Sequence, residues 1–142
     1  MLKTLRQIAS IGIVSERPPQ ADESLRIRDS LQNEIRAVLG RALCIRHIDA
    51  GSCNGCELEI HALNNAVYDV ERFGIRFVAS PRHADVLLVT GPVTHNMKVA
   101  LERTYAATPD PNWVVAVGDC AAGCGVFEGS YAVVGAVEKV VP

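Results

Sequence analysis

From residue 43 onward, the sequence alternates between two kinds of apolar pattern. Short runs rich in Val, Ile and Leu, typical of buried strands, alternate with longer stretches of helical spacing. The expected strands are residues 43–49, 75–79, 85–90 and 113–118, and the expected helices are about 56–73 and 94–107. This alternation with short connections predicts an α/β fold with an open parallel sheet, right-handed crossovers and helices on both faces.

The cysteines gather in two turns that follow expected strands. Cys53 and Cys56 form a Cys-x-x-Cys pair after the first strand, and Cys120 and Cys124 stand in a turn after the last one. In open α/β sheets the carboxyl ends of the strands meet at one edge, where ligands bind. We therefore expect Cys53, Cys56 and Cys120 to come together at this edge.

Several thiols at one edge point to inorganic chemistry. Thiolates are soft ligands that suit zinc and iron–sulfur clusters, and a cluster needs several of them. A zinc ribbon normally has two Cys-x-x-Cys pairs, and a dithiol enzyme has no need of Cys120. The pattern favours an iron–sulfur site and leaves zinc and dithiol chemistry open. Cys44, inside an apolar run, is expected to be a small buried hydrophobic residue.

The composition limits the alternatives. At 142 residues and 15.3 kDa the chain is long enough for one domain with an ordinary core. Five cysteines in a chain without a secretory signal argue against a disulfide framework. The net charge of −2 gives no nucleic-acid signal, and no apolar run approaches the ~20 residues that cross a bilayer. We expect a cytoplasmic protein without a nucleic-acid partner.

Residues 1–42 have a different character from the rest and are expected to form a helical arm and linker. The apolar residues of a first short helical pattern share one face: Leu2, Leu5, Ile8 and Ala9. Prolines 18 and 19 interrupt this pattern, and Ser24 is the expected cap of a second helix that ends near Leu39. These helices either cover a face of the domain or dock to partner subunits or a membrane-bound complex.

Six segments carry a more specific resemblance. They are residues 49–57, 71–75, 80–85, 91–94, 118–121 and 130–134. Together they resemble the small, iron–sulfur subunit of nickel–iron hydrogenases and its relative in NADH:quinone oxidoreductase (complex I). The likeness covers residues 43–142 and implies a flavodoxin-like iron–sulfur domain there.

The first cysteine turn separates two branches of this family. The quinone-reductase branch has two adjacent cysteines, whereas the hydrogenase branch has the Cys-x-Gly-Cys-Glu found at residues 53–57. The chain therefore most resembles the membrane-associated energy-converting or formate-hydrogenlyase type.

The resemblance implies an electron-transfer role within an oxidoreductase complex. A 4Fe-4S cluster on Cys53, Cys56 and Cys120 would relay electrons between a nickel–iron large subunit and a ferredoxin-like iron–sulfur subunit. Membrane-embedded subunits would be further partners, so the chain would lie peripherally on the inner face of the cell membrane. Alone, it would be inactive with hydrogen.

The fourth cluster ligand departs from the family pattern. In the family it lies in a later Gly-Cys-Pro-Pro segment, whereas this sequence ends at Pro142. Cys124 occupies a position where the family usually has glycine. We expect that the C-terminal part of the domain is missing. The alternatives are a shortened variant that uses Cys124 as a metal ligand, or loss of the cluster.

Glu57 directly follows Cys56 at an expected helix start, where the helix dipole favours a carboxylate. Its expected role is either a proton relay toward the partner or a plain helix N-terminal acid. The four histidines, His47, His61, His83 and His95, are expected to be scaffold residues rather than ligands.

Two other functions stay open at this point. One is a complex I-type quinone oxidoreductase subunit, which the separation of Cys53 and Cys56 disfavours. The other is a cluster-free scaffold of such a complex.

Overall fold

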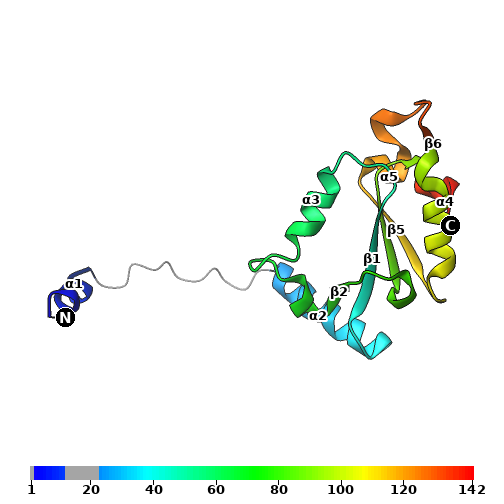
Figure 1. Cartoon of the computed structure of the whole chain (residues 1–142). Helices are drawn as coiled ribbons and strands as arrows, with labels where there is room; N and C mark the ends of the chain where they lie inside the picture. The colour runs from blue at the N-terminus through cyan, green and yellow to red at the C-terminus, as the bar shows by residue number, and fades with distance from the viewer. Residues whose placement is uncertain (1, 12–22) are drawn as a thin grey trace.

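Two helices precede the sheet in the computed structural model, which describes residues 2–11 and 23–142 (Figure 1). They are α1 (Leu2–Ile11) and α2 (Glu23–Leu39). Because α2 begins at Glu23, Ser24 lies in its first turn, and the prediction that Ser24 caps this helix is wrong. Gly40 follows α2 with a φ of +64°, as expected of a stop signal. Prolines 18 and 19 lie outside the described residues.

The central feature is a four-stranded parallel sheet in the order β2-β1-β3-β5. Its strands are β1 (Leu43–Asp49), β2 (Ile75–Phe77), β3 (Val86–Thr90) and β5 (Trp113–Val117). Helices α3 (Gly55–Ala62) and α4 (His95–Ala107) lie on opposite sides of it (Figure 1). The expected α/β fold with helices on both faces is confirmed.

The core lies between the central strands, α4 and the C-terminal residues. Leu87 and Val89 of β3 and Leu101 of α4 are fully buried in one cluster. Burying each such side chain stabilises the fold by roughly 1.5–3 kcal/mol. This packing fixes β1 and β3 rigidly, and both cysteine turns leave the sheet at the same end.

The prediction of a single helix over 56–73 is wrong, because α3 ends at Ala62. The side-chain oxygen of Asn65 accepts hydrogen bonds from the N–H groups of Val67 and Tyr68, at 2.9 and 2.8 Å. Such local bonds compete with helical ones. Only a 3₁₀ turn, η1 (Val70–Phe73), follows before β2, which ends at Phe77, two residues earlier than predicted.

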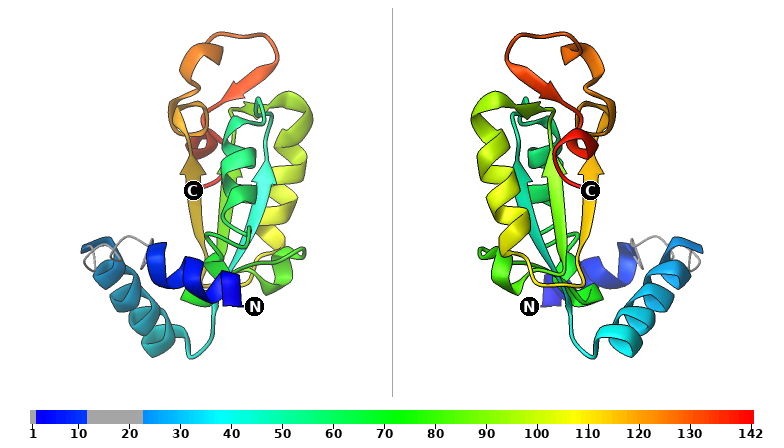
Figure 2. Two further views of the ribbon diagram at one scale, coloured as in Figure 1. Left: turned by 90° about the vertical axis from the view of Figure 1, so that its left-hand side faces the viewer. Right: turned by 90° about the vertical axis from the view of Figure 1, so that its right-hand side faces the viewer.

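A small antiparallel pair, which the sequence did not predict, borders the cysteine end of the sheet. It joins β4 (Val93–Thr94) to β6 (Val133–Gly135). The other short elements are α5 (Asp119–Gly123), η2 (Pro81–His83), η3 (Gly125–Phe127) and η4 (Val137–Lys139). Figure 2 shows the segment after α5 at one end of the sheet and α2 at the other.

The N-terminal helix α1 keeps apolar side chains exposed. Leu2 is 78% and Ile11 58% exposed. Within residues 2–11 and 23–142, no helix is both long and apolar enough to cross a membrane. The prediction that residues 1–42 form an arm stays a prediction.

Candidate metal-binding site at the sheet edge

The first cysteine turn is shaped by Asp49 at the end of β1. One carboxylate oxygen of Asp49 accepts the N–H groups of Gly51 and Ser52, both at 2.8 Å. Burial would raise the pKa of Asp49, but the N–H donors of Ser52 and Gly51 outweigh it and hold this pKa below its usual value. The Ser52 hydroxyl accepts the N–H of Asn54 at 3.2 Å. The turn therefore places Cys53 just before α3 and Cys56 in its first turn.

The second cysteine turn follows β5 through Gly118. This glycine has φ 82° and ψ 159°, a backbone region essentially restricted to glycine, and it directly precedes α5. Cys120 lies in the first turn of α5, and Cys124 ends this helix with a φ of 64°. Asp119 is the first residue of α5.

The Cys56 thiol of the first turn lies against Gly118 of the second turn. A Cβ atom on Gly118 would lie 2.8 Å from the Cys56 sulfur, so only glycine leaves room for that thiol. Burial raises the pKa of Cys56, and the charges of Glu57, Cys53 and Cys120 raise it further. The structure thus places the two cysteine turns next to each other, and the role of Cys53, Cys56 and Cys120 as a ligand set stays a prediction.

The donors suit a cluster better than a single ion. Among the residues that the structure describes, no group of three or more His, Cys, Asp or Glu side chains is close enough together to hold a metal ion. A 4Fe-4S cluster takes one thiolate on each iron, so its ligands stand farther apart than those of one ion. The Cys56 sulfur against a glycine without a side chain, in reach of the charges of Cys53 and Cys120, fits part of such a site, and these three cysteines are the residues that would hold the cluster.

Cys124 differs from the other cysteines of this edge. It is only 4% exposed, its N–H donates to the Cys120 carbonyl at 3.0 Å, and it is not among the groups that raise the pKa of Cys56. In this arrangement Cys124 belongs to the packed interior. Its role as a fourth ligand stays a prediction.

Glu57 directly follows Cys56 in the first turn of α3. It is 5% exposed, and neither carboxylate oxygen has a hydrogen bond of acceptable geometry. Burial would raise the pKa of Glu57, but the nearby hydroxyls of Thr90 and Ser52 and the backbone at the start of α3 hold it below its usual value. An ionised carboxylate is thus buried next to a candidate ligand.

His47 is the nearest basic group to Glu57, and the sequence interpretation of His47 as scaffold overlooked this contact. Its Nε2 lies 3.8 Å from Glu57 Oε1 and 3.0 Å from the hydroxyl of the fully buried Thr90. The available signal was strand alternation, which directs the side chains of His47 and Thr90 to the same face of adjacent parallel strands. The other histidines lie where expected, His61 on α3, His83 in η2 and His95 at the start of α4.

A cavity of about 460 Å³ lies at the opposite end of the sheet, and its lining includes none of Cys53, Cys56 and Cys120. At its wall Asp85 accepts two hydrogen bonds from Arg41 and one, at 2.9 Å, from the Cys44 N–H. Cys44 is half-buried, and Arg41 donates to its sulfur at 3.3 Å, so the prediction of a fully buried Cys44 is wrong. Because Asp85 already has its partners, the thiols at the other edge are the stronger candidate site.

The fold and the site define a class of protein, a parallel α/β domain with clustered thiols at the carboxyl edge of its sheet. The chain belongs to the family described as NADH ubiquinone oxidoreductase, 20 Kd subunit, which matches residues 53–142. The matched region includes all three converging cysteines.

Two relatives are subunits of hydrogen-metabolising complexes by name. The probable membrane-bound hydrogenase subunit mbhJ of Pyrococcus furiosus is 45% identical over 104 residues, 73% of this chain and 62% of the relative. Formate hydrogenlyase subunit 7 of Escherichia coli K12 is 40% identical over 125 residues, 88% of this chain and 48% of the relative. The chain thus spans less than two thirds of the length of these relatives.

A solved structure supports the same fold. A chain of the membrane-bound sulfane sulfur reductase, an archaeal respiratory membrane complex, superimposes with a TM-score of 0.61 and 34% identity. The match covers 75% of this chain and 58% of the other. The family resemblance inferred from the sequence is confirmed.

Proposed function

We propose that the protein is the electron-transfer subunit of a hydrogenase-type oxidoreductase complex, with Cys53, Cys56 and Cys120 holding a 4Fe-4S cluster. The observation that carries this proposal is the close approach of the Cys56 sulfur to Gly118 of the second cysteine turn, where the charges of Cys53 and Cys120 also act on Cys56. When bound, such a cluster supplies one-electron transfer. The Asp49 turn and the core contacts of β1 and β5 hold the ligand loops in place before any cluster binds.

Cys124 is proposed not to be the fourth ligand. Its burial, with only 4% exposed, supports this choice. If Cys124→Ser abolishes the 4Fe-4S signal of the reconstituted chain, Cys124 is the ligand instead.

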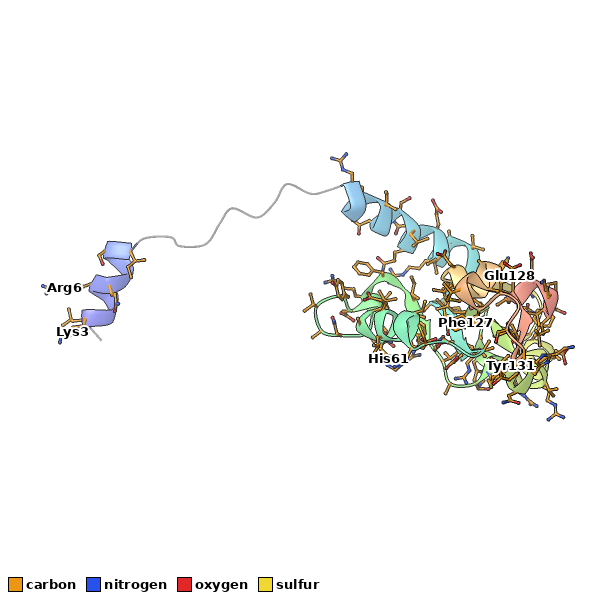
Figure 3. All side chains as sticks on the ribbon, turned by 90° about the horizontal axis from the view of Figure 1, so that it is seen from above. Lys3, Arg6, His61, Phe127, Glu128 and Tyr131 are labelled. Atoms are coloured by element: carbon orange, nitrogen blue, oxygen red, sulfur yellow. The ribbon has the colours of Figure 1, made fainter. Side chains whose placement is uncertain are left out.

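A catalytic partner is proposed to cover the thiol edge. A nickel–iron site would need a second set of thiols, whereas only Cys44, at the opposite end of the sheet, and the buried Cys124 remain once Cys53, Cys56 and Cys120 hold a cluster. Three large apolar side chains near the cysteine turns are exposed: Leu58 by 64%, Val126 by 89% and Tyr131 by 96%. Figure 3 shows Tyr131 and its neighbours Phe127 and Glu128 on the segment that follows α5. An exposed apolar group of this kind is typical of an interaction site.

The remaining partners follow from the names of the relatives. We propose a nickel–iron large subunit at the thiol edge, a ferredoxin-like iron–sulfur subunit as the next electron carrier, and membrane-embedded subunits that hold the complex on the inner face of the cell membrane. The relatives named as a membrane-bound hydrogenase subunit and a formate hydrogenlyase subunit support this assembly.

Glu57 is proposed to relay protons between this edge and the catalytic partner. Its place directly after Cys56, buried and with Oε1 3.8 Å from His47 Nε2, supports the role, because a relay needs an ionisable group beside the site and a second one within reach. Replacing Glu57 with Gln should slow proton-coupled turnover of the assembled complex. Unchanged turnover would leave Glu57 as a helix N-terminal acid.

Anaerobic preparation of the chain distinguishes electron transfer from scaffolding. Reconstitution with iron and sulfide should give a brown protein with broad visible absorbance and, after reduction, an EPR signal. A folded chain that stays colourless under these conditions would support the cluster-free scaffold instead.

A further inference from the structure

Arg46 of β1 is a half-buried cation without a partner in the part of the chain that the structure describes. Its Nε is buried and has no hydrogen-bond partner there. The ion pairs of the described residues involve Arg41, His47 and Lys98, and none involves Arg46. A buried donor without an acceptor costs free energy, more so when the group is charged. An anion beside Arg46 would remove this cost.

A cavity of about 260 Å³ lies beside Arg46. Its polar lining consists of Arg46 and His47 from β1 and of His61 and Asn64 from α3, and His61 is labelled on α3 in Figure 3. Each of these side chains can donate a hydrogen bond from nitrogen. Of the described residues, none that lines the cavity is acidic. One water occupies about 30 Å³ of liquid, so the cavity has room for a small organic acid.

The cavity forms where β2 stops short of β1. The last bond between the two segments is donated by the Val78 N–H to the Ile45 carbonyl at 2.9 Å, just after β2 ends. Beyond Ile45, this edge of β1 has no neighbouring strand among the described elements. Arg46 and His47 belong to opposite faces of β1 by strand alternation, and both line the cavity because it opens at the edge of the sheet.

The backbone supplies one more donor at this edge. Within a parallel sheet, successive N–H groups of a strand point alternately to its two neighbours. The Ala50 N–H donates to the Thr90 carbonyl of β3 at 2.9 Å. By that alternation, the N–H of His47 faces the other side, where β2 has ended.

We propose that this cavity is a binding site for a carboxylate, held by the guanidinium of Arg46 and the side-chain amide of Asn64. A guanidinium matches a carboxylate with two parallel N–H···O bonds. Arg46 is the one lining group with a permanent charge, which suits a monoanion better than a dianionic phosphate. The inference goes beyond the proposed function, because it concerns a different ligand at a different edge of β1.

The site does not depend on a protonated histidine. Burial is the main cause that lowers the pKa of His47; Glu57 and Asp49 oppose it, and the charges of His61 and Arg46 add to it. A neutral imidazole still donates one hydrogen bond. Glu57 is the carboxylate nearest to His47, with Oε1 3.8 Å from Nε2, but it does not line the cavity.

The first test measures acetate binding to the whole reduced chain without a cluster. Acetate that replaces chloride at constant ionic strength should raise the Tm, because a ligand of the folded state stabilises it. It should also shift the ¹⁵N resonance of Arg46 Nε in NMR spectra. Arg46→Gln should weaken acetate binding at least about tenfold, because hydrogen bonds between charged groups are the strong ones.

Matched variants make the result specific. Arg76→Gln removes an exposed arginine of the neighbouring strand β2 that does not line the cavity, and it should leave acetate binding unchanged. If Arg46→Gln does not fold, Asn64→Ala replaces it, since Asn64 is exposed and its loss should also weaken acetate binding.

Three results would overturn the proposal. One is an Arg46 resonance that does not respond to acetate, and another is equal weakening of acetate binding in the Arg46 and Arg76 variants. The third is tighter binding of inorganic phosphate than of acetate, which would contradict a carboxylate site.

The carboxylate can belong to a free acid or to an acidic side chain of a partner subunit. Acetate binding that persists in the complex with a co-expressed catalytic subunit indicates a free acid. Acetate binding that is lost on assembly, together with weaker capture of the subunit by Arg46→Gln, indicates a partner side chain. Loss on assembly with normal capture by Arg46→Gln would contradict both sources.

These outcomes are separable from the proposed electron transfer. Iron content and EPR report on the cluster without reference to Arg46. A chain that takes up a cluster but does not bind acetate would lose the carboxylate site and keep the electron-transfer role. Acetate binding by a chain that takes up no cluster would do the reverse.

Discussion

Because Gly118 has no side chain, the backbone of the second cysteine turn can approach the Cys56 sulfur closely. In Gly118→Ala, the backbone at φ 82° and ψ 159° would cost about 1–3 kcal/mol, because this region is essentially restricted to glycine. The added Cβ would also stand 2.8 Å from the Cys56 sulfur, which must then move. We therefore expect both a loss of stability and a displaced ligand.

Two other glycines separate these effects. Gly129 has a φ of +77° with nothing within 4 Å of an added Cβ, so Gly129→Ala measures backbone strain alone, roughly 1–2 kcal/mol. Gly123 lies in α5 with open space around it, so Gly123→Ala should be neutral or slightly stabilising. Urea unfolding of the reduced, cluster-free chain gives the three free energies of unfolding.

Cluster uptake gives the decisive comparison. Only Gly118→Ala should also reduce the iron bound after anaerobic reconstitution, because only there does the new methyl group meet a ligand. Iron content in Gly118→Ala equal to that in Gly129→Ala would refute the placement of Cys56 against Gly118.

Three further predictions concern the core, the half-buried His47 and the exposed apolar surface. Leu101→Ala should lower the free energy of unfolding by about 2–5 kcal/mol in urea, since this residue is fully buried; a loss below 1 kcal/mol would contradict the core described above. Burial lowers the pKa of His47, so the unfolded chain binds this proton more tightly, and stability should fall as the pH drops below about 6.5. His47→Gln should reduce this loss of stability at low pH. A stability profile of the variant identical to that of the wild type would contradict the assignment of this pH dependence to His47. Replacing Val126 and Tyr131 with Ser should change the free energy of unfolding by no more than about 0.5 kcal/mol but weaken capture of a co-expressed catalytic subunit; normal capture would exclude this surface.

The sheet could be predicted from the sequence because its signal is local. Each strand is a short apolar run of β-branched and Leu residues, and parallel strands place their carboxyl ends at one edge. The meeting of Cys53, Cys56 and Cys120 follows from that rule without any knowledge of side-chain positions.

The errors arose where local hydrogen bonds or distant contacts decide the structure. The Asn65 side chain ends the helical region by binding two backbone N–H groups, which apolar spacing does not reveal. The β4–β6 pair is too short to leave a pattern. The contact of His47 with Glu57 depends on how α3 packs over β1, and only the alternation that puts His47 and Thr90 on one face hinted at it.

The most direct measurement of the central claim is the iron and EPR content of single cysteine variants after anaerobic reconstitution. Cys53→Ser, Cys56→Ser and Cys120→Ser should each lose or alter the 4Fe-4S signal. Cys44→Ser, at the opposite end of the sheet, should retain it in full. A signal that survives in Cys120→Ser, or is lost equally in Cys44→Ser, would contradict a cluster held by thiols from the two turns.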